Sequence, residues 1–169
     1  MLFQSLEFIL FLPLVFLIYW FACSKNLKAQ NFFIIISSYI FYGWWDWRFL
    51  SLIIISSLAD FLIGKKMGGG LDKTKRKYLL VASLILNLGV LGFFKYFNFF
   101  ISSLINSFQA FGIEFSFSRL EIILPVGISF YTFQTLSYTI DVYKGKQKSI
   151  DDPIAFFAFV SFFPQLVAG

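Results

Sequence analysis

Long stretches without charge constrain this chain more than any other feature of its sequence. Residues 8–23 and 31–45 contain no charged side chain, and 59% of the 169 residues are hydrophobic while only 14% are charged. Soluble domains carry about 25% charged residues, so water would not solvate the surface that this composition would expose. A hydrocarbon core about 30 Å thick is crossed by roughly 17–25 apolar helical residues. We therefore predict an all-α fold, a polytopic bundle of transmembrane helices.

Five apolar segments and the start of a sixth are separated by short polar connections. The five span 8–23, 31–45, 49–64, 78–96 and 122–143, and the sixth begins at 154. Pro13 lies inside the first segment and should kink it, because proline removes a helical hydrogen bond. The sequence therefore predicts about five to six membrane segments within a single multi-span domain over 1–169.

Basic residues gather in every second connection. Eleven of the 14 Lys and Arg residues follow the first, third or fifth segment, and the remaining three are Arg48, Lys95 and Arg119. Cytoplasmic connections of membrane proteins are enriched in Lys and Arg. This asymmetry predicts a cytoplasmic position for the basic connections and an N-terminus outside the cell.

The basic run over 65–77 admits two interpretations. It could bind lipid headgroups or nucleic acid, or it could serve only to orient the helices around a flexible turn at Gly68, Gly69 and Gly70. We favour the second interpretation. A net charge of +5 requires no nucleic-acid partner, and we expect the lipid bilayer to be the main partner.

Two aromatic segments fit the edges of a bilayer. Residues 97–112 are aromatic but interrupted by Asn and Ser, so they either lie in the outer interface or continue the fourth segment. Trp44, Trp45 and Trp47 stand where the second segment should leave the membrane. An aromatic belt explains these three residues without an active site.

Asp60 is a charged group inside an apolar segment, where it costs at least about 2.5 kcal/mol at mid-depth. It precedes Lys65 and Lys66 by about one and a half helical turns, which places it near the cytoplasmic interface. We favour a structural role, in which Asp60 pairs with Lys66 or caps a neighbouring helix.

The fifth segment carries a stripe of polar side chains. At 100° per residue, one face holds Gly127, Phe130, Tyr131, Gln134, Ser137, Tyr138 and Asp141. Thr132, Leu136 and Thr139 lie opposite, so the separation is imperfect. The stripe could line a polar substrate tunnel, or it could join helices through hydrogen bonds. The residues favour neither, although the stripe should face the interior of the bundle in both cases.

The sixth segment contains a proline beside a polar amide. Phe163-Pro164-Gln165 should interrupt the helix, and irregular backbone at membrane depth is tolerated only where protein or a cavity shields it. This is either a re-entrant element or the end of a short span. The candidates for lining a substrate tunnel are therefore Gln134, Ser137, Tyr138, Asp141 and Gln165.

Motifs of soluble enzymes are missing from the sequence. The chain has no histidine, a single cysteine (Cys23) and no glycine-rich phosphate-binding loop. We therefore assign no catalytic residue and no metal ligand, and we expect no bound cofactor.

Four strings, taken in order, resemble a known family of membrane enzymes. They are MLF at 1–3 with SLEF at 5–8; FYGWWD at 41–46 with Arg48 and Phe49; GFFKYFNFF at 92–100; and LPVGISF at 124–130 with Gln134, SY at 137–138 and IDVY at 140–143, closed by SFFPQLVAG at 161–169. The set resembles the N-terminal third of the membrane-bound O-acyltransferases, and most closely their alginate O-acetylation branch, which is related to the D-alanine exporters of teichoic-acid modification.

The resemblance implies a fold, a location and an activity. It implies part of a larger multi-pass bundle in a bacterial inner membrane. Members of the family transfer an acyl group, often acetyl, from a cytoplasmic donor to hydroxyl groups of an extracytoplasmic polysaccharide or similar acceptor. The donor would be acetyl-CoA or another acyl carrier, and other polysaccharide-acetylation proteins would be partners.

The resemblance also implies that the proposed catalytic histidine of the family follows residue 169. We therefore expect this chain to be an N-terminal part that is inactive alone. The alternative is a non-enzymatic membrane module, either part of a transporter or a scaffold subunit.

Overall fold

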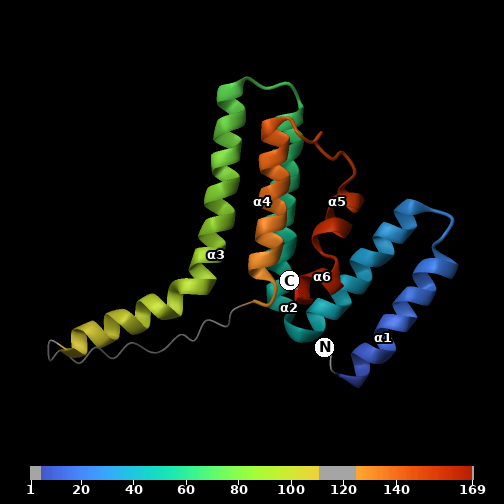
Figure 1. Ribbon diagram of the computed structural model, residues 1–169, viewed down its shortest axis with the longest axis horizontal. Helices are drawn as coiled ribbons and strands as arrows, with labels where there is room; N and C mark the ends of the chain where they lie inside the picture. Colours follow the sequence, from blue (N-terminus) through green and yellow to red (C-terminus); the bar gives the residue numbers. More distant parts are fainter. Residues whose placement is uncertain (1–4, 111–124, 169) are drawn as a thin grey trace.

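The computed structural model describes residues 5–110 and 125–168, and this part of the chain is helical (Figure 1). Its elements are α1 (Leu6–Leu17), the π-helix η1 (Ile18–Ala22), α2 (Leu27–Gly68), α3 (Lys73–Ala110), α4 (Ile128–Lys144), α5 (Pro153–Val160) and α6 (Phe163–Ala168). The all-α prediction is confirmed for these residues. Helix α2 is the centre of the fold, because it contacts α3, α4, α5 and α6.

Helix α2 contains a sharp bend at Asp46. There the backbone is extended, with φ −160° and ψ 112°, whereas the residues on either side are helical. The bend divides α2 into two arms that form a V, visible in Figure 1. It falls between the segments 31–45 and 49–64 that the sequence predicts as separate helices.

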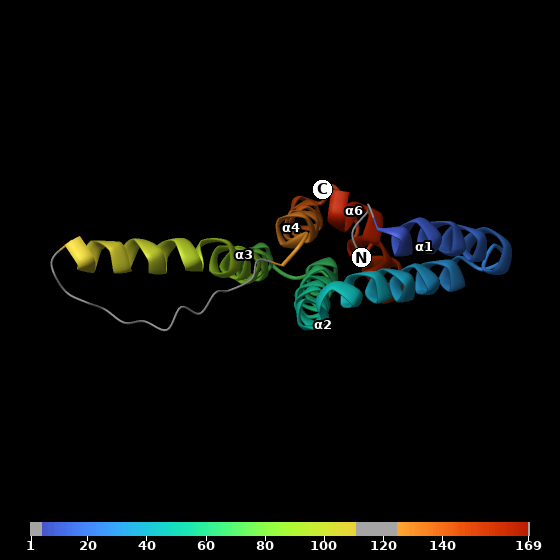
Figure 2. The same ribbon diagram turned by 90° about the horizontal axis from the view of Figure 1, so that it is seen from below.

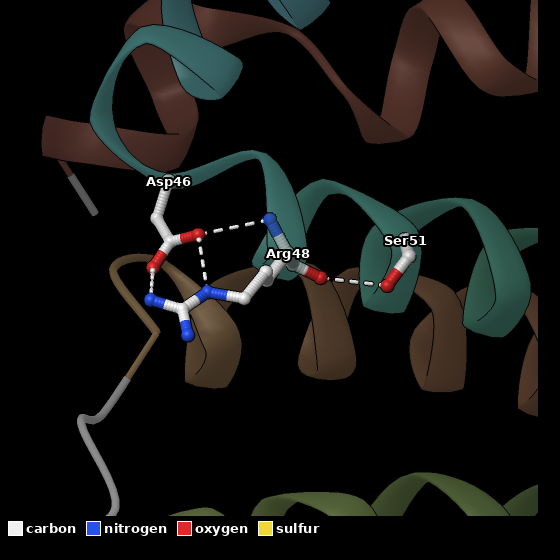
Figure 3. Close-up of polar contacts among 3 residues, drawn as sticks. All are labelled: Asp46, Arg48 and Ser51. Atoms are coloured by element: carbon white, nitrogen blue, oxygen red, sulfur yellow. Dashed lines mark hydrogen bonds and ion pairs between the residues drawn. The ribbon is translucent and has the colours of Figure 1, made fainter.

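The side chain of Asp46 caps the second arm of α2 (Figure 3). Its Oδ1 accepts a hydrogen bond from the backbone N–H of Arg48 at 2.9 Å. The guanidinium of Arg48 donates to both carboxylate oxygens, from Nε and Nη2, each at 3.2 Å. Ser51 Oγ then donates to the Arg48 carbonyl at 2.6 Å. One carboxylate therefore satisfies a backbone N–H of the new helix and fixes the arginine beside it.

Replacing Asp46 by alanine should weaken the second arm of α2. The loss of an N-cap carboxylate costs about 0.5–2 kcal/mol, which thermal unfolding in detergent micelles would report. Asp46→Asn retains an acceptor for the Arg48 N–H, so it should lose less stability than the alanine variant. Equal losses in the two variants would contradict a capping role.

The core lies where the second arm of α2 meets α4 and α5. Phe61, Tyr138 and Phe156 are buried there, and the rings of Tyr138 and Phe156 lie 4.9 Å apart. Gly64 allows this approach, because a Cβ at this position would overlap the Tyr138 ring. A glycine in the interior of a helix is thus explained by an aromatic neighbour.

Helix α3 joins two segments that differ in direction. Its 38 residues form one helix, which runs beside α4 and then turns sideways away from the bundle (Figures 1 and 2). Residues 97–110 therefore continue the helix of the fourth segment but run in a different direction, and a position in the outer interface stays a prediction; residues 111 and 112 lie outside the described part.

The apolar segments at the two ends of the chain both change their helix geometry, although a kink at Pro13 itself stays a prediction. The first segment continues as an α-helix past Pro13, and its hydrogen bonding widens to a π-helix only at Ile18–Ala22. The interruption predicted in the sixth segment is confirmed, because the segment forms two helices, α5 with 8 residues and α6 with 6 residues, separated at Ser161 and Phe162. A rise of about 1.5 Å per residue makes each of them too short to cross a bilayer alone.

The break between α5 and α6 has local causes. Pro164 has no backbone N–H to donate to the Val160 carbonyl, so α5 cannot continue through it, whereas in the first turn of α6 that N–H is not needed. Ser161 Oγ donates to the Phe157 carbonyl at 2.7 Å and closes the end of α5. The backbone N–H of Phe163 donates to Ser38 Oγ of α2 at 3.2 Å, so the interruption is shielded by protein, as irregular backbone in a membrane must be.

Two helices of the described part are long and apolar enough to cross a membrane, Asp46–Gly68 and Lys73–Gln109. The stretches Leu6–Ala22 and Pro153–Leu166 are apolar but shorter. Together with the composition, these helices identify a membrane protein. The number of five to six membrane segments stays a prediction.

Candidate functional site

A groove runs along one face of α4 and is closed on one side by α5. Its volume is about 510 Å³. Four of the five residues predicted to line a substrate tunnel line it: Gln134, Ser137, Tyr138 and Asp141. The other lining residues are Phe130, Phe133, Gln147, Ile150 and Phe159. The helical spacing thus places the four polar side chains along one wall, while α5 and the α4–α5 connection supply the opposite wall.

Gln134 joins α4 to α5 across the groove. Its Nε2 donates to the backbone carbonyl of Phe159 at 2.9 Å. Its Oε1 is buried and accepts no hydrogen bond from the described residues. A buried acceptor without a donor is costly, so a shift of the Gln134 amide that exposes this oxygen to the groove would let a ligand hydroxyl satisfy it.

Tyr138 is held more firmly than its neighbours in the groove. Its ring is buried against Phe156, and its hydroxyl accepts a hydrogen bond from the backbone N–H of Ile150 at 3.1 Å. Ser137 is exposed and Asp141 is half-buried. The hydroxyl of Ser137 and the carboxylate of Asp141 therefore remain accessible, whereas Tyr138 ties the α4–α5 connection to the helix.

Gln165, the fifth predicted residue, lies elsewhere. It is exposed and lines a separate pocket of about 250 Å³ with Asn31, Ala158, Phe159 and others. Phe159 borders both this pocket and the groove. The structure therefore brings four of the predicted residues together and leaves Gln165 on the far side of α5.

Asp60 has different partners from those that the sequence suggests. Its carboxylate accepts hydrogen bonds from Ser83 Oγ and, at 2.7 Å, from Asn87 Nδ2, both on α3. Thr135 Oγ1 of α4 donates to Asn87 Oδ1 at 3.3 Å, and Thr139 Oγ1 lies 3.5 Å from Ser83 Oγ. The predicted pairing with Lys66 is wrong. Asp60 does have a structural role, because these residues form a buried polar cluster that joins three helices.

The threonine face of α4 is the part that the sequence interpretation missed. Thr132, Thr135 and Thr139 are at most 1% exposed, although the polar stripe predicted an interior on the other side of the helix. Their spacing of three and four residues places them on one face. Ser83 and Asn87 have the same four-residue spacing on α3. These two spacings were the signal that could have indicated the cluster.

The groove offers polar contacts but no complete catalytic apparatus within the described residues. The amide of Gln134, the hydroxyl of Ser137 and the carboxylate of Asp141 can hydrogen-bond a polyhydroxylated ligand. None of them has the base and orienting partner that nucleophilic catalysis needs. No cluster of three or more metal-binding side chains occurs in the described part of the chain.

Comparison with known proteins gives the family context. The whole chain is 40% identical to a probable alginate O-acetylase of Pseudomonas putida and 39% identical to that of Pseudomonas aeruginosa. The chain is similar to alginate O-acetylases from end to end. The resemblance derived from the four strings is therefore confirmed.

A further relative modifies a different polymer. The chain is 31% identical, over 94% of its length, to a peptidoglycan O-acetyltransferase of Helicobacter pylori. It spans about a third of the length of these relatives, 34% for the P. putida and H. pylori proteins and 32% for the P. aeruginosa protein. No family model and no solved structure matches the chain.

Proposed function

We propose that this chain forms the N-terminal part of a membrane-bound O-acyltransferase that moves an acetyl group onto hydroxyls of an extracytoplasmic polysaccharide. One observation carries the proposal: relatives named for two different acceptors, alginate and peptidoglycan, are both named for O-acetyl transfer. Similarity to both favours the shared chemistry, acetyl transfer to a sugar hydroxyl, and leaves the acceptor open.

In this proposal the groove along α4 forms part of the path by which a substrate reaches the reaction centre. Gln134, Ser137 and Asp141 would hydrogen-bond the acceptor or the donor, and Tyr138 would hold the wall in place. Gln165 would contact substrate only if the path also ran on the far side of α5. The buried, unpaired Oε1 of Gln134 supports the ligand contact.

The chemical step itself is assigned to residues beyond this sequence. The acceptor hydroxyl oxygen would bond to the acyl carbon, the bond from that carbon to the donor would break, and a base would take the hydroxyl proton. The chain has no histidine, so we propose that the base lies in the remaining two thirds of the protein. The donor would be acetyl-CoA or another acyl carrier, and further polysaccharide-acetylation proteins would assist.

Substitutions in the groove should reduce acetylation in cells that carry the complete protein. Gln134→Leu and Asp141→Asn should each reduce the O-acetyl content of the exported polysaccharide about three- to tenfold, the effect of losing one or two hydrogen bonds. Proton NMR of the polymer would measure this loss. Ser137→Ala should have a smaller effect in the same direction. Ser129→Ala, on α4 but outside the groove, is the matched control and should leave acetylation unchanged.

The proposal that the catalytic base lies outside residues 1–169 can be tested by expressing the protein as two separate parts. Residues 1–169 alone should show no acetyl transfer above that of membranes without the protein. Coexpression with the complementary part should restore transfer, because helices that are stable in lipid can reassemble. Activity of residues 1–169 alone would refute the proposal. A complete protein that acetylates nothing would instead favour a non-enzymatic membrane module.

We propose further that the basic connections face the cytoplasm in a bacterial inner membrane and that the N-terminus lies outside. The α2–α3 and α4–α5 connections lie at the same end of the bundle, and the Asp46 bend lies at the opposite end (Figure 1). In a Cys23→Ser background, Gly69→Cys should therefore resist an impermeant maleimide in intact cells and react after the cells are opened. Labelling of Gly69→Cys in intact cells would mean that the basic connections face the outside, and it would contradict the proposed orientation.

A further inference from the structure

The α2–α3 and α4–α5 connections enclose a pocket at the basic end of the bundle. Its volume is about 460 Å³. Met67 and Gly68 at the end of α2 line it together with Gly70 of the α2–α3 connection, and the α4–α5 connection contributes Gln147, Lys148 and Ser149. The end of α2 touches the α4–α5 connection, since a Cβ at Gly68 would collide with Ser149. The pocket is therefore built by packing between distant parts of the chain.

Arg76 is fixed at the wall of this pocket. Its Nη2 donates to the carbonyls of Val142 at 2.7 Å and Tyr143 at 2.9 Å, the last turn of α4. Its guanidinium carbon also lies 5.8 Å from the centre of the Tyr143 ring. Its Nε is buried and has no hydrogen-bond partner among the described residues. The structure thus orients the guanidinium at the pocket wall and leaves its Nε without a partner.

The charge around the pocket favours an anion. Lys148 lines the pocket together with Arg76, and Asp151 is the acidic residue in the lining. Further lysines stand close by in the sequence, at the end of α2, the start of α3 and the end of α4: Lys65, Lys66, Lys73, Lys75, Lys77, Lys144 and Lys146. The α4 carbonyls, which would repel an anion, are already bonded to Arg76.

We propose that this pocket binds a phosphate group, carried either by an anionic lipid headgroup or by a dissolved phosphorylated molecule. Arginine matches phosphate through its planar set of N–H donors, and lysine adds a point charge. The pocket lies where the candidate spans Asp46–Gly68 and Lys73–Gln109 end and begin, the level at which headgroups are found. A basic connection that only orients helices needs spread positive charge, but neither a pocket nor a fixed arginine.

Binding to the full chain in a zwitterionic detergent tests the proposal. The probes are short-chain phosphatidylglycerol, short-chain phosphatidylcholine and inorganic phosphate, and their binding is measured by native mass spectrometry. Phosphatidylglycerol or inorganic phosphate, or both, should bind, and Lys148→Gln should weaken that binding about tenfold. Arg76→Lys keeps the charge but removes Nε, so it should weaken binding as well. Asp151→Asn should strengthen it.

Lys28→Gln is the matched control, because it removes the same charge in the first turn of α2, away from the pocket. Saturable binding of phosphatidylglycerol but not of inorganic phosphate identifies a lipid headgroup, and the reverse identifies a dissolved phosphate; both outcomes support the site. Equal weakening by Lys28→Gln and Lys148→Gln would mean diffuse charge attraction and overturn the proposal. Failure of both anionic probes to bind would overturn it too. Because Lys148→Gln leaves the Arg76 contacts in place, the test does not depend on Arg76→Lys folding.

Discussion

Gly127→Ala should destabilise the fold by about 3 kcal/mol or more. Gly127 has φ +75° and precedes the first turn of α4, in a backbone region that costs a residue with a side chain about 1–3 kcal/mol. A Cβ there would also lie 2.5 Å from the backbone carbonyl oxygen of Leu166 in α6. Backbone yields less readily than a flexible side chain, so α6 would have to move away from α4.

Gly145→Ala separates the two contributions to this effect. Gly145 has φ +73°, nearly the same conformation, but its Cβ would meet open space. Its substitution should therefore cost only the conformational strain, about 1–2 kcal/mol. Thermal unfolding of both variants in micelles, followed by circular dichroism, gives the comparison. Equal destabilisation would show that the contact between Gly127 and Leu166 contributes nothing.

Asp60→Leu should lower stability by about 2 kcal/mol, the second-largest effect. The substitution leaves the buried donors Ser83 Oγ and Asn87 Nδ2 without their carboxylate acceptor. Hydrogen bonds between membrane helices contribute about 0.6 kcal/mol on average and up to about 1.7 each. Partial compensation is available, because Asn87 Nδ2 also donates to the Ser83 carbonyl at 3.0 Å. The loss of stability should therefore be measurable, but the variant should still fold.

A double-mutant cycle with Ser83→Ala isolates the cluster from general packing effects. If the hydrogen bond to Asp60 is the cause, the loss from Asp60→Leu should shrink when Ser83 is already alanine. Asp72→Leu is the matched control for removing an aspartate. Asp72 is exposed and lies 3.7 Å from Lys75, a surface pair worth about 0–1 kcal/mol. Additive effects of Asp60→Leu and Ser83→Ala would refute the coupling.

Much of the helical pattern follows from local sequence. The polar residues around Asp46 and the tryptophans beside it predict the break in α2, because charge and indole groups favour the membrane edge. The spacing of Gln134, Ser137, Tyr138 and Asp141 likewise places them along one groove. Both features depend on helical periodicity and transfer free energy, which a single sequence carries.

The partners of the polar groups could not be predicted in the same way. Thr139 Oγ1 donates to the Thr135 carbonyl at 2.8 Å, so a threonine on a helix can satisfy its own hydroxyl and resemble an apolar residue. Asp60 finds Ser83 and Asn87, 23 and 27 residues away, because α3 packs against α2. Pro164 predicts the break after α5, but the partner of the Phe163 N–H, Ser38 of α2, is decided by packing in the same way. Such contacts are decided by tertiary packing, which periodicity does not encode.

The V of α2 has a consequence for how the protein is made. Helices α5 and α6 are too short to span lipid separately, and their interrupted backbone is shielded by Ser38 in the first arm of the V. They therefore need the first arm of α2 to be in the bilayer already, as a surface to pack against. The ribosome makes α2 before α5 and α6, so this packing surface exists before the two short helices are synthesised. The bend at Asp46 thus positions the first arm of α2 before α5 and α6 are made, so that these two helices can pack against it once they are synthesised.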